Sequence, residues 1–306
     1  MQTKYHLIIV QLFLYLPMTL YSQDFSSLFS GRVPLISLNT HYHKQSNQEE
    51  TSARANLGVF RGASSQVNLS ARFQELDLDL SENKTLPSRY RQIDAGIAYT
   101  QSSDPKNFWT LSAQYGSASD KPFENSDVST LSLNYVYRFS PNWIFLANYS
   151  NNRSFLNNIP LPSIVYVHTL SRERTILLGV PFLLIRTPIS EKFGLSYTTL
   201  MPYTHKLSLT HQTSPFIQTS INLEQSLQTY LKYQRENSKD QIYFVRRSAY
   251  LSFQSGLSRN IRLAANLGHA FGQRLFEAES FGSSSKSGKE KLKDGAFAKV
   301  DLNITF

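Results

Sequence analysis

Apolar and polar side chains alternate along most of the chain, and the clearest example is its last eight residues. In "KVDLNITF", Val300, Leu302, Ile304 and Phe306 share one face of an extended strand, because successive side chains of a strand point to opposite sides. Helical periodicity is nearly absent after residue 23. The same alternation recurs at 67–74, 93–100, 109–116, 131–139 and 261–268. The pattern therefore predicts an all-β protein.

Two features of this pattern favour a membrane barrel over a soluble sandwich. Apolar faces often end in an aromatic residue, as at Tyr99, Trp109 and Phe139, which is typical of the aromatic girdles at lipid–water boundaries. Connections also alternate between tight and long, as the short periplasmic turns and longer outer loops of such barrels do. We expect tight turns at 140–142, 189–192 and 258–260, and long loops at 43–51, 79–89, 118–127, 151–160 and 278–294. The fold class is a transmembrane antiparallel β-barrel of the bacterial outer membrane.

The strand number depends on the segment "TILLGVPFLLIRTPISEKF", which is apolar on both faces. Pro181 splits it into two arms of about seven residues, shorter than the roughly 9 to 11 residues that a spanning strand needs. Counting both arms gives sixteen strands, and folding them inward gives fourteen. We predict about 14 strands, with 16 or 12 as alternatives.

The start of the chain predicts export. Lys4 precedes the apolar run at 7–21, and Ser22 offers a small residue for cleavage, as in a secretory signal peptide. The alternative is a membrane anchor, although the run is short and is interrupted by Gln11 and Pro17. We expect a signal peptide at 1–22 and a single outer-membrane barrel domain at 23–306.

Charge and cysteine content limit the kinds of partner and site that we expect. Removing Lys4 from the 31 basic residues leaves 30 against 22 acidic ones, and no basic helix suggests nucleic-acid binding. On an exported barrel this surplus suits anionic lipid head groups, so the expected partners are outer-membrane lipids and lipopolysaccharide. The absence of cysteine excludes disulfides and thiolate metal sites.

The polar faces of the strands predict the barrel interior. They are rich in Asn, Ser, Thr, Gln and Gly, and the run Ala264, Asn266, Gly268, Ala270 and Gly272 leaves room for water or for a folded-in segment. A narrow aqueous path and a filled interior with mutually paired charges fit this pattern equally. The candidate lumen-facing charges are Arg72, Asp94, Arg138, Glu224, Arg262, Lys299 and Asp301.

Histidines do not assemble into a recognisable catalytic or metal centre. His41 and His43 share an inward face, but the neighbouring sequence supplies no carboxylate to complete a metal site. His168 with Ser171, and His205 with Ser208, point to opposite faces of their strands, so neither pair fits a nucleophile with its base. We therefore predict no enzyme activity, no metal and no cofactor.

The second half resembles a family of uncharacterised outer-membrane barrels known as a domain of unknown function. The resemblance rests on "NNIPLPSIVYVHTL", "TILLGVPFLLI", "YQRENSKDQIYFVRRSAYLSF", "NLGHAFGQRLFEAESF" and "DGAFAKVDLNITF", and covers roughly residues 150–306. It implies a single barrel and transfers no catalytic or binding residue. The ending on Val300, Leu302, Ile304 and Phe306 is also similar to the signal read by the outer-membrane barrel assembly machinery, which would be a second partner.

Three functional classes remain. The polar interior favours a porin-like or transport channel for small solutes. A structural or surface-interaction barrel without transport is the alternative, and an outer-membrane lipid hydrolase is the third.

Overall fold

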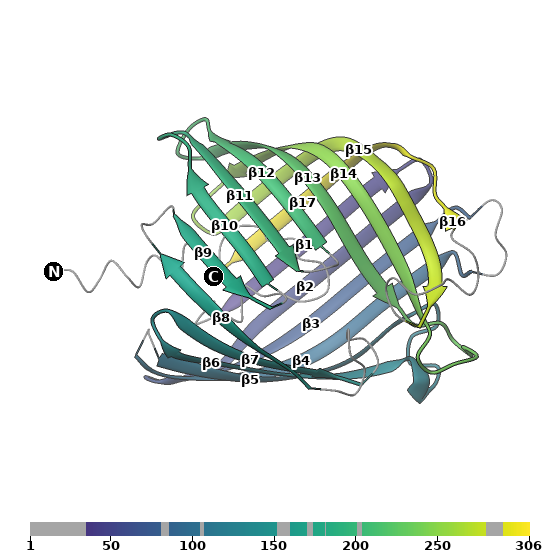
Figure 1. The fold of residues 1–306 in the computed structure, drawn as a ribbon, viewed down its shortest axis with the longest axis horizontal. Helices are drawn as coiled ribbons and strands as arrows, with labels where there is room; N and C mark the ends of the chain where they lie inside the picture. The colour runs from purple at the N-terminus through teal and green to yellow at the C-terminus, as the bar shows by residue number, and fades with distance from the viewer. Residues whose placement is uncertain are drawn as a thin grey trace.

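The structure is a computed structural model in which β-strands dominate (Figure 1). In the described part of the chain, no helix is long and apolar enough to cross a bilayer. The predicted signal peptide at 1–22 lies outside the described residues. These are 35–80, 86–104, 107–151, 160–169, 174–180, 182–200, 204–279 and 290–306.

The described strands form one antiparallel sheet that closes on itself. Each strand pairs with its neighbours in sequence, and closure comes from β1 pairing with β17 and β17 with β15. A two-residue strand, β16, pairs with β15 alone, and a short 3-10 turn, η1 (Ser126–Val128), precedes β6. The strands are β1 (Ile36–Gln45), β2 (Gln48–Arg61), β3 (Ser65–Leu78), β4 (Arg89–Asp104), β5 (Asn107–Ser119), β6 (Ser129–Ser140), β7 (Trp143–Ser150), β8 (Leu161–Thr169), β9 (Thr175–Gly179), β10 (Phe182–Pro188), β11 (Phe193–Leu200), β12 (Thr204–Gln212), β13 (Ile217–Tyr230), β14 (Gln241–Gly256), β15 (Ile261–Ala278), β16 (Glu290–Lys291) and β17 (Gly295–Thr305).

The closed wall has 16 strands, so the predicted count of about 14 is wrong and the alternative of 16 is correct. The difference lies in the apolar hairpin, whose arms β9 and β10 are part of the wall. β9 pairs with β8 and β10, and β10 pairs with β9 and β11. An inward fold would remove these backbone hydrogen bonds, which a wall in lipid cannot replace with water.

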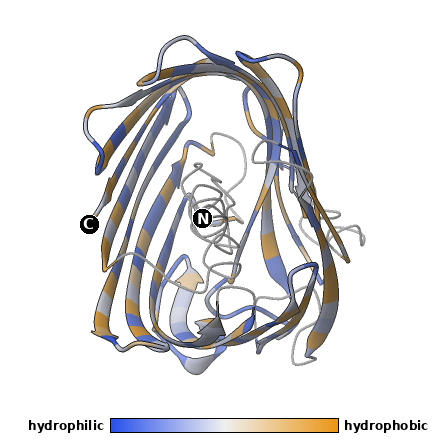
Figure 2. Cartoon of the chain, turned by 90° about the vertical axis from the view of Figure 1, so that its left-hand side faces the viewer, coloured by the Kyte–Doolittle hydropathy of each residue, from blue (hydrophilic) through white to orange (hydrophobic). Residues whose placement is uncertain are grey.

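The outer face of the barrel carries an exposed apolar belt. Leu57, Leu69 and Ile97 are cross-strand neighbours on β2, β3 and β4, and they are 47%, 43% and 50% exposed. Figure 2 shows hydrophobic and hydrophilic positions alternating along the strands around the wall. A closed wall satisfies its own backbone, and an apolar belt outside it requires lipid. The protein is therefore an integral barrel of the outer-membrane type.

The wall is uneven in height, and β1, β6 and β17, with 10 to 12 residues, lie in length between a tall part and a low part (Figure 1). The tall wall, formed by β2–β5 and β13–β15, has strands of 13 to 18 residues. The low wall, β7–β12, has strands of 5 to 9 residues. Tight turns at 189–192, 213–216 and 257–260 lie at the same end as Phe306. We call this end the periplasmic rim, because short turns mark that side of outer-membrane barrels.

Strands of the tall wall continue beyond the apolar belt. There, and on the neighbouring β1, outward residues form cross-strand ion pairs, Lys44 with Glu49 and Arg91 with Glu75. The predicted long loop at 43–51 is wrong, because β1 and β2 form a hairpin that turns at 46–47. Both faces of this hairpin are polar, so its strands have the composition of a loop.

At the outer end, the tall wall closes on itself across the barrel. Leu231, just after β13, donates its backbone N–H to the carbonyl of Ala118 on β5 at 2.8 Å. We call this closure of the tall strands the neck. Strands β6–β12 lie outside the neck. Its interior is a buried cluster of Leu76, Leu78, Leu86, Tyr90, Ala118, Tyr230, Ile242, Phe244, Leu275 and Leu292.

The small inward residues of β15 do not leave the space that their size suggested. Ala270 lies in a buried cluster with Tyr250 and Phe297. A Cβ at Gly268 would collide with the carbonyl oxygen of Ala249 and the Cβ of Tyr250. Part of this run is therefore packed against aromatic side chains instead of water.

We expect Gly268→Ala to lower the free energy of unfolding by about 1–3 kcal/mol, because the added methyl group meets backbone and has nowhere to move. Urea unfolding of the refolded protein in detergent measures this. Gly194→Ala is the matched control, since the nearest atom to its added Cβ is 3.9 Å away. Equal stability of the two variants would contradict the packing at Gly268.

The last residue closes the seam of the barrel. Phe306 donates its N–H to the carbonyl of Ile36 at 2.8 Å and accepts the N–H of Ile36 at 3.2 Å. Val300 is exposed on the outward face of β17, and Phe306 is 62% exposed. Leu302 and Ile304 share the face of Val300 and are partly exposed. The role of these four residues as an assembly signal stays a prediction.

Deleting Phe306 should reduce the folded fraction in the outer membrane several-fold, because the seam loses a backbone pair and the chain loses its terminal aromatic. Heat-modifiable migration of membrane fractions on gels separates folded from unfolded barrels. Phe306→Tyr should fold normally. Normal insertion of the deletion variant would count against a terminal signal.

Candidate functional site: a polar cavity beside the neck

A cavity of about 800 Å³ lies inside the barrel against the low wall. Inward side chains of β10–β15 and β17 line it. At one end it reaches the turns of the periplasmic rim, with Ser190, Pro215 and Ser258 among its lining residues. The cavity is therefore bounded by the wall itself and opens toward the rim.

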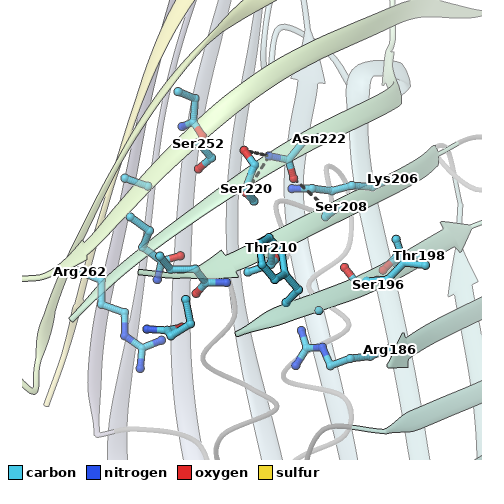
Figure 3. A pocket seen from close by; sticks show the side chains of 18 of the residues that line it. Arg186, Ser196, Thr198, Lys206, Ser208, Thr210, Ser220, Asn222, Ser252 and Arg262 are labelled. Carbon is cyan, nitrogen blue, oxygen red and sulfur yellow. Dashed lines mark hydrogen bonds between the residues drawn. The ribbon is translucent and has the colours of Figure 1, made fainter. Parts of the chain in front are cut away.

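Short polar side chains give the cavity its shape (Figure 3). Ser196, Ser208 and Ser220 project inward from β11, β12 and β13. The Ser208 hydroxyl donates to the amide oxygen of Asn222 at 2.7 Å, and the Asn222 amide donates to Ser220 at 2.9 Å. Small hydroxyl and amide groups leave open volume and offer hydrogen bonds to water. Such a lining suits a hydrated solute.

The cavity spans the whole height of β12 but only the lower part of the tall wall. On β12 the inward residues from Thr204, at its outer end, to Gln212, near the rim, all line the cavity. On the tall wall the lining ends at Glu224 and Tyr250. The cavity thus runs beside the neck, toward the outer ends of the low strands.

Two linked charge pairs mark where the cavity meets the tall wall. Lys206 Nζ lies 3.9 Å from Glu224, which also accepts the Tyr250 hydroxyl at 2.7 Å. Lys299 Nζ lies 3.6 Å from Asp301, and His41 Nδ1 lies 2.7 Å from the same carboxylate. Each carboxylate here is held by a cation and by a further polar group, so this layer is close to neutral.

A second polar layer fills the neck. Glu50 on β2 is completely buried, and Arg246 on β14 lies 3.2 Å from its carboxylate. Gln74 and Gln228 donate to the other Glu50 oxygen at 2.9 and 3.0 Å. His43 lies 3.4 Å from Arg246 and stacks on a neighbouring aromatic ring. These contacts join strands across the lumen, so they tie the neck together.

The predicted lumen-facing charges divide into three groups. Glu224, Arg262, Lys299 and Asp301 lie along the cavity. Arg72 and Asp94 are cross-strand partners on β3 and β4, on the opposite wall. There, Arg72 donates to Gln74 at 2.8 Å, and Asp94 is buried beside Gln92. Arg138 donates to the carbonyl of Pro141 at 2.6 Å, so it caps a turn at the rim.

Sequence reasoning missed several charged groups of the interior. Glu50 was hidden by the expected loop at 43–51. Arg246 and Arg247 are adjacent, so strand parity places only one of them inward, and the sequence alone does not say which. Asp301 is the carboxylate beside His41 that the local sequence did not supply, since the two strands meet only at the seam. Among the described residues, no group of three or more His, Cys, Asp or Glu side chains is placed to hold a metal ion.

No protein-family model matches the chain, and no curated protein matches it by sequence. Among the similar solved structures, two are described as outer-membrane proteins and a third is LpxR. Omp33 of Acinetobacter baumannii is 8% identical, with 89% of this chain and 98% of that chain covered and a TM-score of 0.38. An outer membrane channel from Pseudomonas putida F1 is 8% identical, with 90% and 96% covered and a TM-score of 0.38. LpxR from Salmonella typhimurium is 7% identical, with 88% and 100% covered and a TM-score of 0.33. At these values the likeness carries no functional argument.

We expect Glu50→Leu to destabilise the barrel by about 3–5 kcal/mol, because it leaves the buried Arg246 without its counter-charge. The double variant Glu50→Leu, Arg246→Met should recover much of that loss. Glu49→Gln is the control: its carboxylate is exposed, so the change should cost less than about 1 kcal/mol. Urea unfolding monitored by tryptophan fluorescence measures all three. Equal effects at positions 49 and 50 would contradict the polar layer in the neck.

Proposed function

We propose that this protein is an outer-membrane channel for small water-soluble solutes, with its path along the low wall. The observation that carries the proposal is the extent of the cavity, from the rim turns to Thr198 and Thr204 near the outer ends of β11 and β12. The neck closes only the outer part of the barrel, where the tall strands meet. A solute can therefore cross beside the neck while its charged and apolar contacts stay intact.

The lining supports passive movement in preference to tight binding. Ser, Thr, Asn and Gln side chains follow the cavity on β11–β14, and they replace part of a solute's hydration without a fixed ring of one charge. A porin-like path of this kind conducts because no single position binds strongly.

One observation favours the alternative of a surface-interaction barrel. The neck extends beyond the apolar belt with ion-paired, exposed side chains such as Lys44 and Glu49. A rigid projection of this kind could contact other molecules outside the cell. Conductance decides between the two proposals.

The outer surface of the barrel supports a proposal about its lipid partners. Arg247 and Arg274 are exposed on β14 and β15, and Lys291 is the cross-strand partner of Arg274 on β16. They lie toward the outer end, where phosphates of outer-membrane lipids and lipopolysaccharide would complement them. We also infer insertion by the barrel assembly machinery through the C-terminal strand, and membership in the uncharacterised barrel family that the second half resembles.

The path can be tested with single cysteines, since the natural chain has none. The wild-type protein should give discrete single-channel currents in a planar bilayer. In Ser196→Cys and Thr210→Cys, a bulky water-soluble thiol reagent should reduce the current by at least half, because both side chains line the cavity.

Ala118→Cys is the control, because Ala118 is completely buried in the neck. It should neither react nor change conductance. Absence of wild-type current at every applied voltage would overturn the channel proposal. Current that persists after complete labelling of position 196 or 210 would overturn the path along the low wall.

A further inference from the structure

We propose that the channel selects anionic solutes, and that Arg186 and Arg262 at its periplasmic mouth form the selecting site for carboxylate or phosphate groups. This inference rests on the proposed function and adds its substrate class.

The charges that line the cavity are unequal in number. Among the described residues that line it, six lysine and arginine side chains face three acidic ones. Near the neck, two lysines are balanced by Glu224 and Asp301 at 3.9 and 3.6 Å. The surplus is therefore concentrated toward the rim, where four cations, Arg186, Lys192, Arg259 and Arg262, accompany Glu191.

The two inner arginines of this mouth stand on separate parts of the wall. Arg186 projects from β10 on the low wall, and Arg262 projects from the start of β15 on the tall wall (Figure 3). Both side chains line the same cavity. A solute that enters the cavity from the rim therefore passes both side chains.

The type of side chain indicates the type of ligand. A guanidinium group is planar and presents paired N–H donors that match the two oxygens of a carboxylate or phosphate. The hydroxyl groups of Ser196 and Ser252 beyond the mouth can donate to the remaining oxygens. A small cation meets repulsion at the mouth, whereas a small oxyanion is attracted from both sides.

The decisive measurement is the reversal potential across a bilayer with a KCl gradient. Wild-type channels should show a chloride-over-potassium permeability ratio of about five, the size of effect that two cations near a narrow aqueous path produce. Arg186→Gln with Arg262→Gln should bring the ratio near one, and the corresponding double change to Glu should bring it below one. Inorganic phosphate and citrate added at the rim side should reduce chloride current in the wild type and much less in the Gln variant.

Arg91→Gln is the matched control, because Arg91 faces outward and pairs with Glu75 outside the lumen. It should keep the wild-type ratio, and heat-modifiable migration verifies that each variant is folded. Cation preference in the wild type, or an unchanged ratio in the Gln variant, would overturn the anion site and leave the channel standing. If no variant conducts, calorimetric titration with inorganic phosphate tests the site alone: loss of binding in the Gln variant supports it, and no binding to the wild type overturns it.

Discussion

Closure of the backbone hydrogen-bond ladder is the constraint on which the structure depends. In lipid, an unpaired strand edge would leave N–H and C=O groups without partners, at several kcal/mol each. Pairing of β1 with β17 removes the last edge and brings residues about 260 positions apart into register, such as His41 and Asp301. Once this register is set, strand parity decides which side chains meet lipid and which face the interior. The apolar belt and the cavity are therefore two consequences of the same closure.

The neck shows what happens where the wall no longer needs to face lipid. Beyond the belt, the tall strands approach one another until β5 and β13 share a hydrogen bond. The interior there is buried, so a charged side chain inside it needs partners. Glu50 satisfies this condition through Arg246 and two glutamines that reach it from other strands. A buried charge without these partners would oppose folding, so the polar layer also fixes how the strands meet.

Much of this fold could be predicted from alternation alone. Apolar residues that recur at every second position indicate a strand with one apolar face. The prediction failed where that signal disappears for a physical reason. At the β1–β2 hairpin the inward residues Gln48 and Glu50 serve the neck while Glu49 faces water, so both faces are polar and the segment reads as a loop. At β9 and β10 both faces are apolar, and the strands are too short to be recognised as spanning.

The candidate site was only partly accessible to the same reasoning. Parity identified Glu224, Arg262, Lys299 and Asp301 as inward. It could not say which of the inward residues lie together, because that depends on the register of a closed wall. Arg186 shows this limit well, since it belongs to the hairpin whose place in the wall was misjudged.

The unequal height of the wall reconciles a closed neck with an open cavity. If all strands were as long as β14 and β15, the outer end of the barrel would be either closed all the way round or open all the way round. Because β10–β12 end early, they stay outside the β5–β13 contact and their inward hydroxyl groups line the cavity, whereas β7 and β8 contribute Ile144, Leu146 and Val165 to a second buried apolar cluster. The tall strands thus provide the packed neck, and β10–β12, together with β13–β15 and β17, provide the polar surface of the proposed path. Of the two short strands that the sequence does not identify as spanning, β10 is thereby one of the strands that line the cavity.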